Sequence, residues 1–231
     1  MDEDTRISRR ASLAKLGGLV AGAAAVGGWK LAEDSSAGPA GVASGAVTCV
    51  LAPEQTEGPY YLDDHKVRRN ITEGRPGVPL TLRLTVLDVS TCKPIKGAAV
   101  EIWHCDGGGV YSGVSVQNTE DKRFLRGIQR TDAKGVAVFQ TIYPGWYSGR
   151  TVHIHVMVHV GGNVVHTGQL YFADILTDTV YKRSPYKRRP SRTTRNAADS
   201  TYRNGGKRST LKLAKSGSAY VGSITMGVQR S

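Results

Sequence analysis

Two histidines placed two residues apart are the clearest sign of chemistry in this sequence. Residues 151–160 alternate branched apolar residues with His153, His155, Met157 and His159. In a strand, alternate side chains share one face, so His153 and His155 stand about 6.6 Å apart at the backbone. Imidazoles at that separation can converge on one ion, whereas His159 lies too far along the strand to join them. The segment therefore predicts a metal site on a strand face.

Two tyrosines in nearby turns bear on which metal this would be. Tyr147 lies in the loop PGWYSGR at residues 144–150, which leads into the strand, and Tyr111 follows a run of three glycines. Tyrosines near turns are usually only packing residues, and a His-x-His pair by itself also fits zinc. A phenolate, however, is a hard anionic oxygen ligand that suits a hard trivalent ion such as Fe(III).

Taken in order, several motifs resemble those of the intradiol ring-cleavage dioxygenases, the family of protocatechuate 3,4-dioxygenase and catechol 1,2-dioxygenase. They are TEGPYY at 56–61, IW at 102–103 with Tyr111 eight residues later, RTVHIH at 150–155 and QLYF at 169–172. The resemblance covers residues 49–175 through several independent motifs. It implies a non-haem Fe(III) oxidoreductase that uses O₂ to open a catechol between its two hydroxyl carbons, giving a cis,cis-muconate-type diacid.

The resemblance implies four iron ligands and one Fe(III) per chain. Tyr111 and His153 match the equatorial ligands of the family, and Tyr147 and His155 match the axial ones. Two tyrosinates and one hydroxide would balance the charge of Fe³⁺, which suits a partly buried site. Coordination displaces the phenol proton, although a free phenol has a pKa of about 10.

Further roles follow from the same resemblance. Arg150 matches the active-site arginine, which would stabilise negative charge on the substrate, and Gln169 matches the glutamine near the O₂ side. Tyr60 and Tyr61 match residues that line the substrate pocket. Tyr147 would have a second role, as the base that accepts a catechol proton.

Two departures from the intracellular enzymes are visible. Only five residues separate Tyr147 from His153, which resembles the short secreted branch of the family. Between the signal and Thr56 there is no room for the helical dimerisation segment of the catechol enzymes, so the oligomeric state of those enzymes does not transfer. We expect a monomer.

Strand patterns dominate the part of the chain that must position these residues. Leu80, Leu82, Leu84 and Val86 alternate with polar residues, the mark of a half-buried strand. Further strands are predicted at 98–103, 135–142, 151–160, 164–172 and 219–228, separated by turns rich in Gly, Asp and Pro. We expect an all-β fold, an antiparallel β-sandwich with long irregular loops, and irregular structure over residues 177–218.

The N-terminal residues have a different character. Residues 1–34 combine paired arginines with a short apolar, Gly-rich run, which indicates an export signal of the twin-arginine type, although Ser12 stands where that signal usually has Phe. We expect a linker at 35–48 and one domain at 49–231, secreted to the extracellular space. The apolar run is too short to hold the mature protein in a membrane.

Positive charge is concentrated outside that signal. The net charge is +12, and the five basic and five acidic residues of 1–34 cancel. Much of the excess lies in residues 182–195, beside Tyr181 and Tyr186. No nucleic-acid recognition motif accompanies this run, so we expect a solvated loop that at most adsorbs to anionic surfaces or attracts acidic aromatic substrates.

Three cysteines allow one internal disulfide. Cys49 begins the predicted domain and Cys92 lies in a turn, so these two are the preferred pair. Cys105 lies near the predicted metal site, where we expect it to be buried and reduced.

Two rival functions fit part of the pattern. A zinc hydrolase could use His153 and His155, but it needs a third ligand and an acid/base residue, for which His104 and Asp106 are the nearest candidates. A secreted β-sandwich module that binds polysaccharide or cell wall would explain the aromatic residues and the positive charge. It would leave the two histidines without a role.

Overall fold

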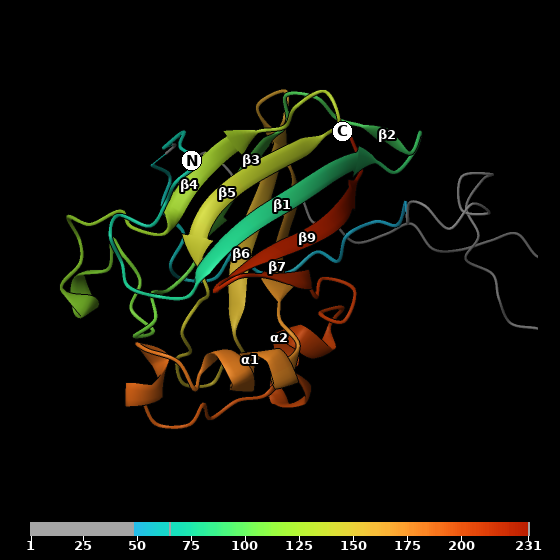
Figure 1. Cartoon of the computed structure of the whole chain (residues 1–231). Coiled ribbons are helices and arrows are strands. Elements are labelled where there is room, and N and C mark those ends of the chain that lie inside the picture. The colour runs from blue at the N-terminus through green and yellow to red at the C-terminus, as the bar shows by residue number, and fades with distance from the viewer. Residues whose placement is uncertain (1–48, 65, 231) are drawn as a thin grey trace, which may run out of the picture. The chain divides into compact units, whose positions relative to one another are not determined.

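The computed structural model describes residues 49–64 and 66–230. The predicted export signal at 1–34 and linker at 35–48 lie outside the described residues. The described chain forms two β-sheets that pack face to face (Figure 1). The short helices of residues 174–203 gather at one end, and the 3₁₀ helix η2, Ser115–Gln117, lies apart from them. The predicted all-β sandwich is therefore confirmed.

The first sheet is built around its longest strands. Its path is β2-β1-β9-β8. β5 pairs with residues 79–85 of β1, on the same edge that β2 meets at Leu87 and Asp88. The bounds are β1 Pro79–Asp88, β2 Lys93–Pro94, β5 Val136–Ile142, β8 Lys212–Ser216 and β9 Ala219–Val228. β1 and β9 run parallel, and the other pairs of this sheet are antiparallel.

The second sheet carries the histidine strand in its interior. Its order is β4-β3-β6-β7, and all of its pairs are antiparallel. The bounds are β3 Ala99–Trp103, β4 Arg126–Arg130, β6 His153–Val160 and β7 Asn163–Tyr171. Because β6 has a strand on each side, both of its edges are hydrogen-bonded and its side chains are held in register.

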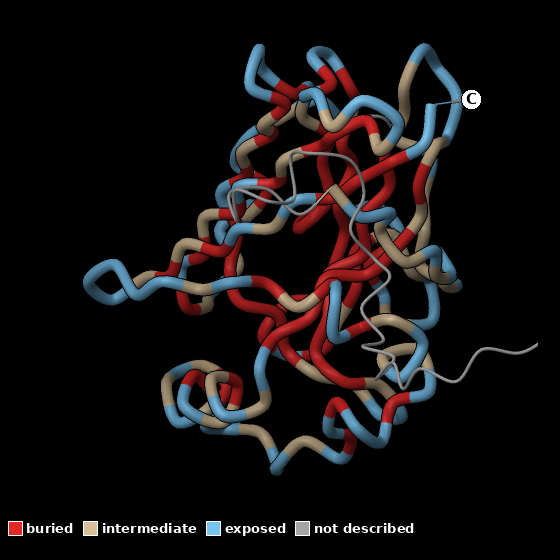
Figure 2. The backbone as a smooth tube through the Cα atoms, turned by 90° about the vertical axis from the view of Figure 1, so that its right-hand side faces the viewer, coloured by how far each residue is buried: buried red, intermediate tan, exposed pale blue. Residues whose placement is uncertain are grey.

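The core lies between the sheets, where Figure 2 shows the buried backbone concentrated. Leu80, Leu82 and Leu84 of β1 are at most 1% exposed, as their alternation predicts, and the aliphatic face of β6 packs in the same cluster. Each fully buried aliphatic side chain contributes about 1.5–3 kcal/mol to folding. This packing fixes which face of β6 points away from the core.

Besides the two-residue β2, two strands were not predicted. β4 has a buried arginine in its pattern, so it lacks the apolar alternation that marks a strand. β8 is a largely exposed edge strand within residues 177–218, which were expected to be irregular. Pairing with neighbours, rather than its own sequence, makes each of these segments a strand.

The rest of residues 177–218 forms short helical turns. α1 spans Asp174–Val180 and α2 spans Ser200–Arg203, with the 3₁₀ helices η3 at Tyr186–Arg188 and η4 at Asn196–Ala198 between them. Figure 1 places α1 and α2 together at one end of the sandwich. None of the helices in the described residues has the length and apolar character needed to cross a membrane.

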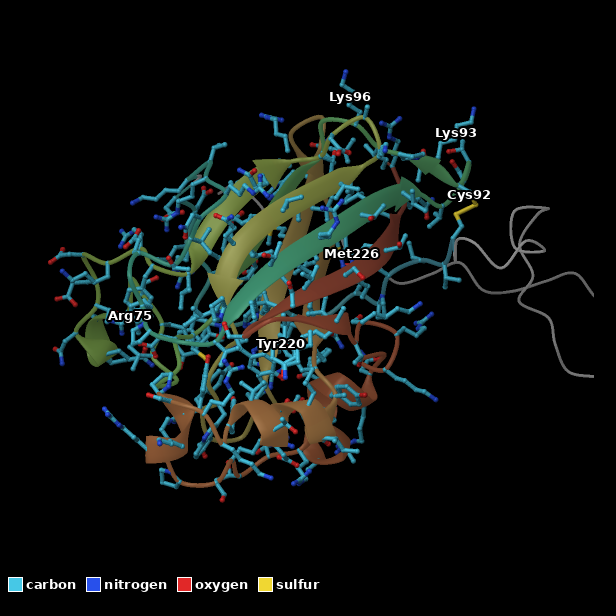
Figure 3. All side chains as sticks on the ribbon, in the orientation of Figure 1. Arg75, Cys92, Lys93, Lys96, Tyr220 and Met226 are labelled. Carbon is cyan, nitrogen blue, oxygen red and sulfur yellow. A yellow bond between two sulfur atoms is a disulfide. The ribbon has the colours of Figure 1, made fainter. Side chains whose placement is uncertain are left out.

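A disulfide ties the start of the described chain to the first sheet. Cys49 and Cys92 are bonded, with Cα atoms 5.6 Å apart, and the sulfur–sulfur bond is visible beside Cys92 in Figure 3. Cys105 is buried and carries a free thiol. Its Sγ donates to the Gly145 carbonyl at 3.5 Å, and burial raises the pKa of this thiol to about 12.

Candidate metal centre

The face of β6 that points away from the core is also buried. His153, His155 and Met157 lie on this face and are at most 3% exposed, because loops from three parts of the chain cover them. In the antiparallel register, His155 pairs with Trp103 on one side and Gln169 on the other, and His153 pairs with Tyr171. His159 lies further along, 3.5 Å from the Glu101 carboxylate, and takes no part in this group.

Three of the four predicted ligands meet at one point. The Nε2 atoms of His153 and His155 are 3.1 Å apart, and the Tyr147 hydroxyl is 3.0 Å from His153 Nε2. The fourth, Tyr111, places its ring centroid 5.7 Å from that of Tyr147 and 6.2 Å from that of His155. The structure thus brings together the two tyrosines and two histidines that the family resemblance implied.

Both histidines are held in the neutral form, which is the form that can bind a metal. His153 Nδ1 donates to the Thr151 carbonyl at 2.7 Å, so its proton lies on Nδ1 and its Nε2 lone pair faces the cluster. Burial, assisted by the positive charge of Arg150, lowers the pKa of His153 to about 3. Burial and the neighbouring His153 hold the pKa of His155 well below its usual value.

Tyr111 is held by its own backbone. Its N–H donates to the Gln117 side chain at 2.7 Å, and its carbonyl accepts from the Thr119 hydroxyl at 2.6 Å. Upstream, Asp106 accepts from the N–H groups of Gly108 and Val110 and so closes the glycine turn that leads to Tyr111. These contacts direct the ring inward, and the Tyr111 residue is 1% exposed.

The loops that carry the two tyrosines pack against each other. A β-carbon at Gly109, whose φ is +83°, would overlap the Trp146 carbonyl, so this approach requires glycine. The Gly145 N–H donates to the Asp106 carbonyl at 3.0 Å. Arg189 spans both loops, with its guanidinium over the Trp146 ring and a donor to the Trp146 carbonyl at 2.6 Å.

The segment at 56–61 covers the cluster. Gly58 lies directly against the His155 ring, where a β-carbon would come within 3.1 Å of Cε1. The Tyr60 ring stacks on Tyr111, with centroids 4.3 Å apart, and stands edge-on to Tyr147 at 6.1 Å. Tyr61 instead packs on Trp103 at 5.1 Å, away from the tyrosine pair. Of the two predicted pocket residues, Tyr60 therefore lies nearer to the ligands.

Arg150 lies beside the cluster and is held from two sides. Its Nη2 donates to Gln169 Oε1 at 2.5 Å, and its Nε donates to Asp199 Oδ2 at 2.9 Å. Gln169 Nε2 in turn donates to the Thr56 carbonyl at 3.0 Å, which ties the covering segment to the same group. Sequence reasoning missed Asp199. Its only local signal is an N-cap pattern, Asp before Ser-Thr, which predicts a helix start but no link to Arg150.

The contacts of the cluster fit a cation. The Tyr111 hydroxyl is buried without a hydrogen-bond partner of normal geometry. Burial, followed by the neighbouring Cys105 and Tyr147, holds the pKa of Tyr111 well above its usual value. Two neutral imidazole nitrogens 3.1 Å apart, facing phenol oxygens in a buried space, form a set of donors with no internal counter-charge. A bound cation would satisfy all of them, and phenolate oxygen with imidazole nitrogen is a donor set suited to Fe(III).

The additional ligands that a zinc hydrolase would need are engaged elsewhere. His104 is bonded through Nε2 to the Thr141 hydroxyl at 2.7 Å, and burial lowers its pKa to about 4. Asp106 is occupied by its own turn and by Arg75. Among the described residues, no group of three or more His, Cys, Asp or Glu is arranged to hold a metal ion.

The basic segment offers no free aromatic surface. Tyr181 and Tyr186 stack on each other at 5.2 Å and pack towards the core, and Tyr186 is 3% exposed. Arg192 and Arg195 form ion pairs with the aspartates of α1. Part of the basic segment therefore stabilises the helical end of the sandwich through ion pairs with α1.

Comparison with known proteins agrees with the fold and the site. A sequence model described as Dioxygenase matches residues 56–181. The solved intradiol ring-cleavage dioxygenase from Tetranychus urticae is 38% identical, with a TM-score of 0.75 over 78% of this chain and 95% of that one. The dioxygenase domain of a carbohydrate-binding fusion protein from Streptomyces sp. SirexAA-E is 31% identical, with a TM-score of 0.61, and covers 79% of this chain and 100% of that one.

A curated relative extends the comparison to the catechol enzymes. Catechol 1,2-dioxygenase 1 of Acinetobacter lwoffii is 32% identical over 100 residues, which are 41% of this chain and 32% of that protein. The match thus spans about a third of the length of that relative. The chain belongs to the intradiol ring-cleavage dioxygenase family, a family of oxidoreductases.

Proposed function

We propose that this protein uses Fe(III) and O₂ to cleave catechol-type aromatics between their hydroxyl carbons, giving cis,cis-muconate-type diacids. The observation that carries the proposal is the buried convergence of Tyr147, His153 and His155 beside Tyr111. Membership of a family that generally depends on non-haem iron supports the choice of metal.

The four residues would hold one ferric ion per chain. When bound, the ion supplies Lewis acidity that favours a doubly deprotonated catechol and makes its ring reactive towards O₂. The protein's part is to present two imidazole nitrogens that are already neutral and two phenols in a water-poor site. Burial raises the pKa of Tyr147 to about 12 in the metal-free chain, so deprotonation of its hydroxyl depends on a nearby cation.

Tyr147 is the candidate base for the substrate. Its hydroxyl reaches His153 Nε2, and the side chain lies in a loop between two glycines, whereas Tyr111 is anchored by hydrogen bonds on both sides of its peptide. A phenolate oxygen at this position can accept a catechol proton at Oη. Tyr111 would keep its place throughout.

Arg150 is the candidate for charge stabilisation. Its guanidinium is fixed by Gln169 and Asp199 beside the histidines, so it needs no reorientation when negative charge develops on the substrate. Gln169 acts here as a holder of Arg150, since its oxygen and its nitrogen are both engaged in the metal-free chain.

Tyr60 and the covering segment would shape the substrate site. The Tyr60 ring lies parallel to Tyr111 and edge-on to Tyr147, which leaves an aromatic wall next to the ligands. An aromatic wall favours a flat ring such as catechol by stacking. Gly58 keeps the cover close to His155 and limits the access of water from that side.

The setting of the reaction is also part of the proposal. We propose that the chain is exported by a twin-arginine signal at 1–34 and acts outside the cell as a monomer. The disulfide between Cys49 and Cys92 supports an oxidising compartment. Adsorption to anionic surfaces would rely on exposed cations of the basic segment such as Lys182, Lys187 and Arg188.

Oxygen uptake with the iron-loaded protein and a panel of small catechols tests the proposal. We expect a red-brown protein, because tyrosinate-to-Fe(III) charge transfer absorbs visible light, and stoichiometric O₂ uptake with formation of a diacid. A colourless protein that retains zinc, or a yellow semialdehyde product, would contradict it. A binding module would show neither colour nor O₂ uptake with any catechol.

A further inference from the structure

One carboxylate, that of Asp199, touches two consecutive residues at the edge of the candidate centre. Its Oδ2 accepts from Arg150 Nε at 2.9 Å and from the Thr151 N–H at 2.8 Å. Arg150 and Thr151 immediately precede the histidine strand. Asp199 lies 48 residues after Thr151 and is 1% exposed.

The other oxygen of Asp199 is anchored to its own segment. Oδ1 accepts from the N–H groups of Thr201 and Tyr202 at 2.8 and 3.0 Å, which caps the first turn of α2. Asn196 adds a second tie, because its Oδ1 accepts from the Thr151 hydroxyl at 2.6 Å and its Nδ2 donates to the Phe172 carbonyl at 2.8 Å. The position of the Asp199 carboxylate is therefore fixed by the backbone of α2 and by the neighbouring Asn196.

Thr151 passes this constraint to a predicted iron ligand. Its carbonyl accepts the Nδ1 proton of His153 at 2.7 Å, and that bond directs His153 Nε2 towards the cluster. Displacement of the Thr151 peptide would thus rotate or release the imidazole. Asp199 is the only acceptor that the structure shows for the Thr151 N–H among the described residues.

We propose that Asp199 is the positioning residue of this active site: it aims the Arg150 guanidinium and, through Thr151, orients His153. The inference rests on the proposed function for the role of Arg150, and on the metal site alone for the role of His153. It explains why an ionised carboxylate is placed in a buried position. Four N–H groups converge on its two oxygens, and a single amide oxygen could not accept from all four.

Asp199→Asn is the informative change, because it keeps the shape and removes the charge and one acceptor. Asp178→Asn is the matched control: Asp178 lies in α1, at the same helical end of the sandwich, and pairs with Arg192 and Arg195, away from the ligands. Both variants are made in the full iron-loaded chain, alone and with Arg150→Ala. The measurements are thermal unfolding, release of iron to a chelator, the visible band, and kcat and KM with the best catechol of the panel.

We expect Asp199→Asn to lower kcat by about tenfold or more with a smaller change in KM, a usual effect of losing the partner of an active-site group. In the Arg150→Ala background the same change should lower kcat less than about threefold, because the shared interaction is already gone. Asp178→Asn should lower thermal stability while kcat stays at the wild-type value. An equal loss of kcat in both backgrounds would show that Asp199 does not act through Arg150.

The rate of iron release tests the link from Asp199 to His153, and this measurement needs no turnover of substrate. Asp199→Asn should release iron at least about threefold faster than wild type and shift the visible band, while Arg150→Ala and Asp178→Asn keep the wild-type rate. Release at the wild-type rate would overturn the link to His153. If no catechol is consumed by the wild type, the proposed function fails, and the iron-release result still decides whether Asp199 orients the ligand.

Discussion

The Trp103 indole lies parallel to the His155 imidazole, with ring centroids 5.0 Å apart and 6° between the planes. The two residues are direct neighbours across β3 and β6, so the sheet register sets the stack. Trp103 also contacts the ring of Tyr61, with centroids 5.1 Å apart. His155 is thereby confined between the indole and Gly58, although its Nδ1 has no hydrogen bond to fix it.

Replacement of Trp103 by Leu should therefore loosen His155. We expect a stability loss of roughly 2–4 kcal/mol, as for other large buried aromatic side chains, together with faster release of iron to a chelator. Phe139→Leu is the control, because Phe139 is fully buried in β5 and does not touch the candidate centre. Urea unfolding and chelator kinetics measure both effects. The stack has no role in metal retention if the two variants release iron equally fast.

Removal of either histidine of the cluster should abolish iron retention. His153→Ala and His155→Ala should each weaken iron binding by more than about a hundredfold, since loss of a ligand's partner alone costs 10–100-fold. His159→Ala is the internal control, on the same strand but beside Glu101. Metal analysis and the visible band of the purified proteins give the result. A colourless His159→Ala protein, or a fully loaded His155→Ala protein, would refute the ligand assignment.

The two tyrosines should differ in what their removal affects. Tyr147→Phe should slow the binding of anaerobic catechol by about tenfold or more, because it removes the candidate proton acceptor, while most of the iron is retained. Tyr111→Phe should instead change the visible band in both the free and the catechol-bound protein. Stopped-flow absorbance distinguishes them. If Tyr147→Phe binds catechol at the wild-type rate, Tyr147 is not the base that accepts the second catechol proton.

The disulfide should contribute substantially to stability. Cys49 and Cys92 are 43 residues apart, and a loop of that length corresponds to about 4 kcal/mol in the loop-entropy description. The double variant Cys49→Ser, Cys92→Ser should therefore unfold at lower urea concentration than the wild type. Non-reducing peptide mapping provides the direct check, with Cys105 alkylated only after unfolding. A disulfide that includes Cys105 would contradict the pairing.

Glu101 predicts an unusual dependence of stability on pH. Burial, followed by the negative charges of Asp64 and Asp63, raises its pKa from 4.5 to about 7 in the folded chain. The folded state then prefers the protonated carboxyl, so this contribution is present below pH 4.5 and is lost as the pH rises through about 7. Its loss would lower the free energy of unfolding by up to about 3 kcal/mol.

Glu101→Gln should remove that dependence. We expect the variant to be more stable than wild type in urea at pH 8, and the difference to shrink as the pH falls towards 4.5. Glu120→Gln, at an exposed position, serves as the control and should follow the wild type at every pH. Parallel curves for wild type and Glu101→Gln would mean that Glu101 titrates normally.

Local patterns were sufficient for most of the fold. The alternation of Leu80, Leu82 and Leu84 predicted β1, and similar patterns placed β6, β7 and β9 to within about two residues. A period of two is a property of the extended chain itself, so it is visible without knowledge of the neighbours. The same period placed His153 and His155 on one face. The assignment of Tyr111 and Tyr147 as their partners came from the resemblance to a family.

Contacts between distant residues were decided only by the tertiary structure. The parallel pairing of β1 with β9 joins segments that lie more than a hundred residues apart, and neither sequence indicates the other. Asp199 resembles an ordinary helix cap until Arg150 and Thr151 are seen beside it. The raised pKa of Glu101 likewise depends on which charges fold against it. The hydrophobic periodicity of a segment shows which of its faces is buried and which is exposed. The burial and charge of a site depend instead on which distant segments pack together.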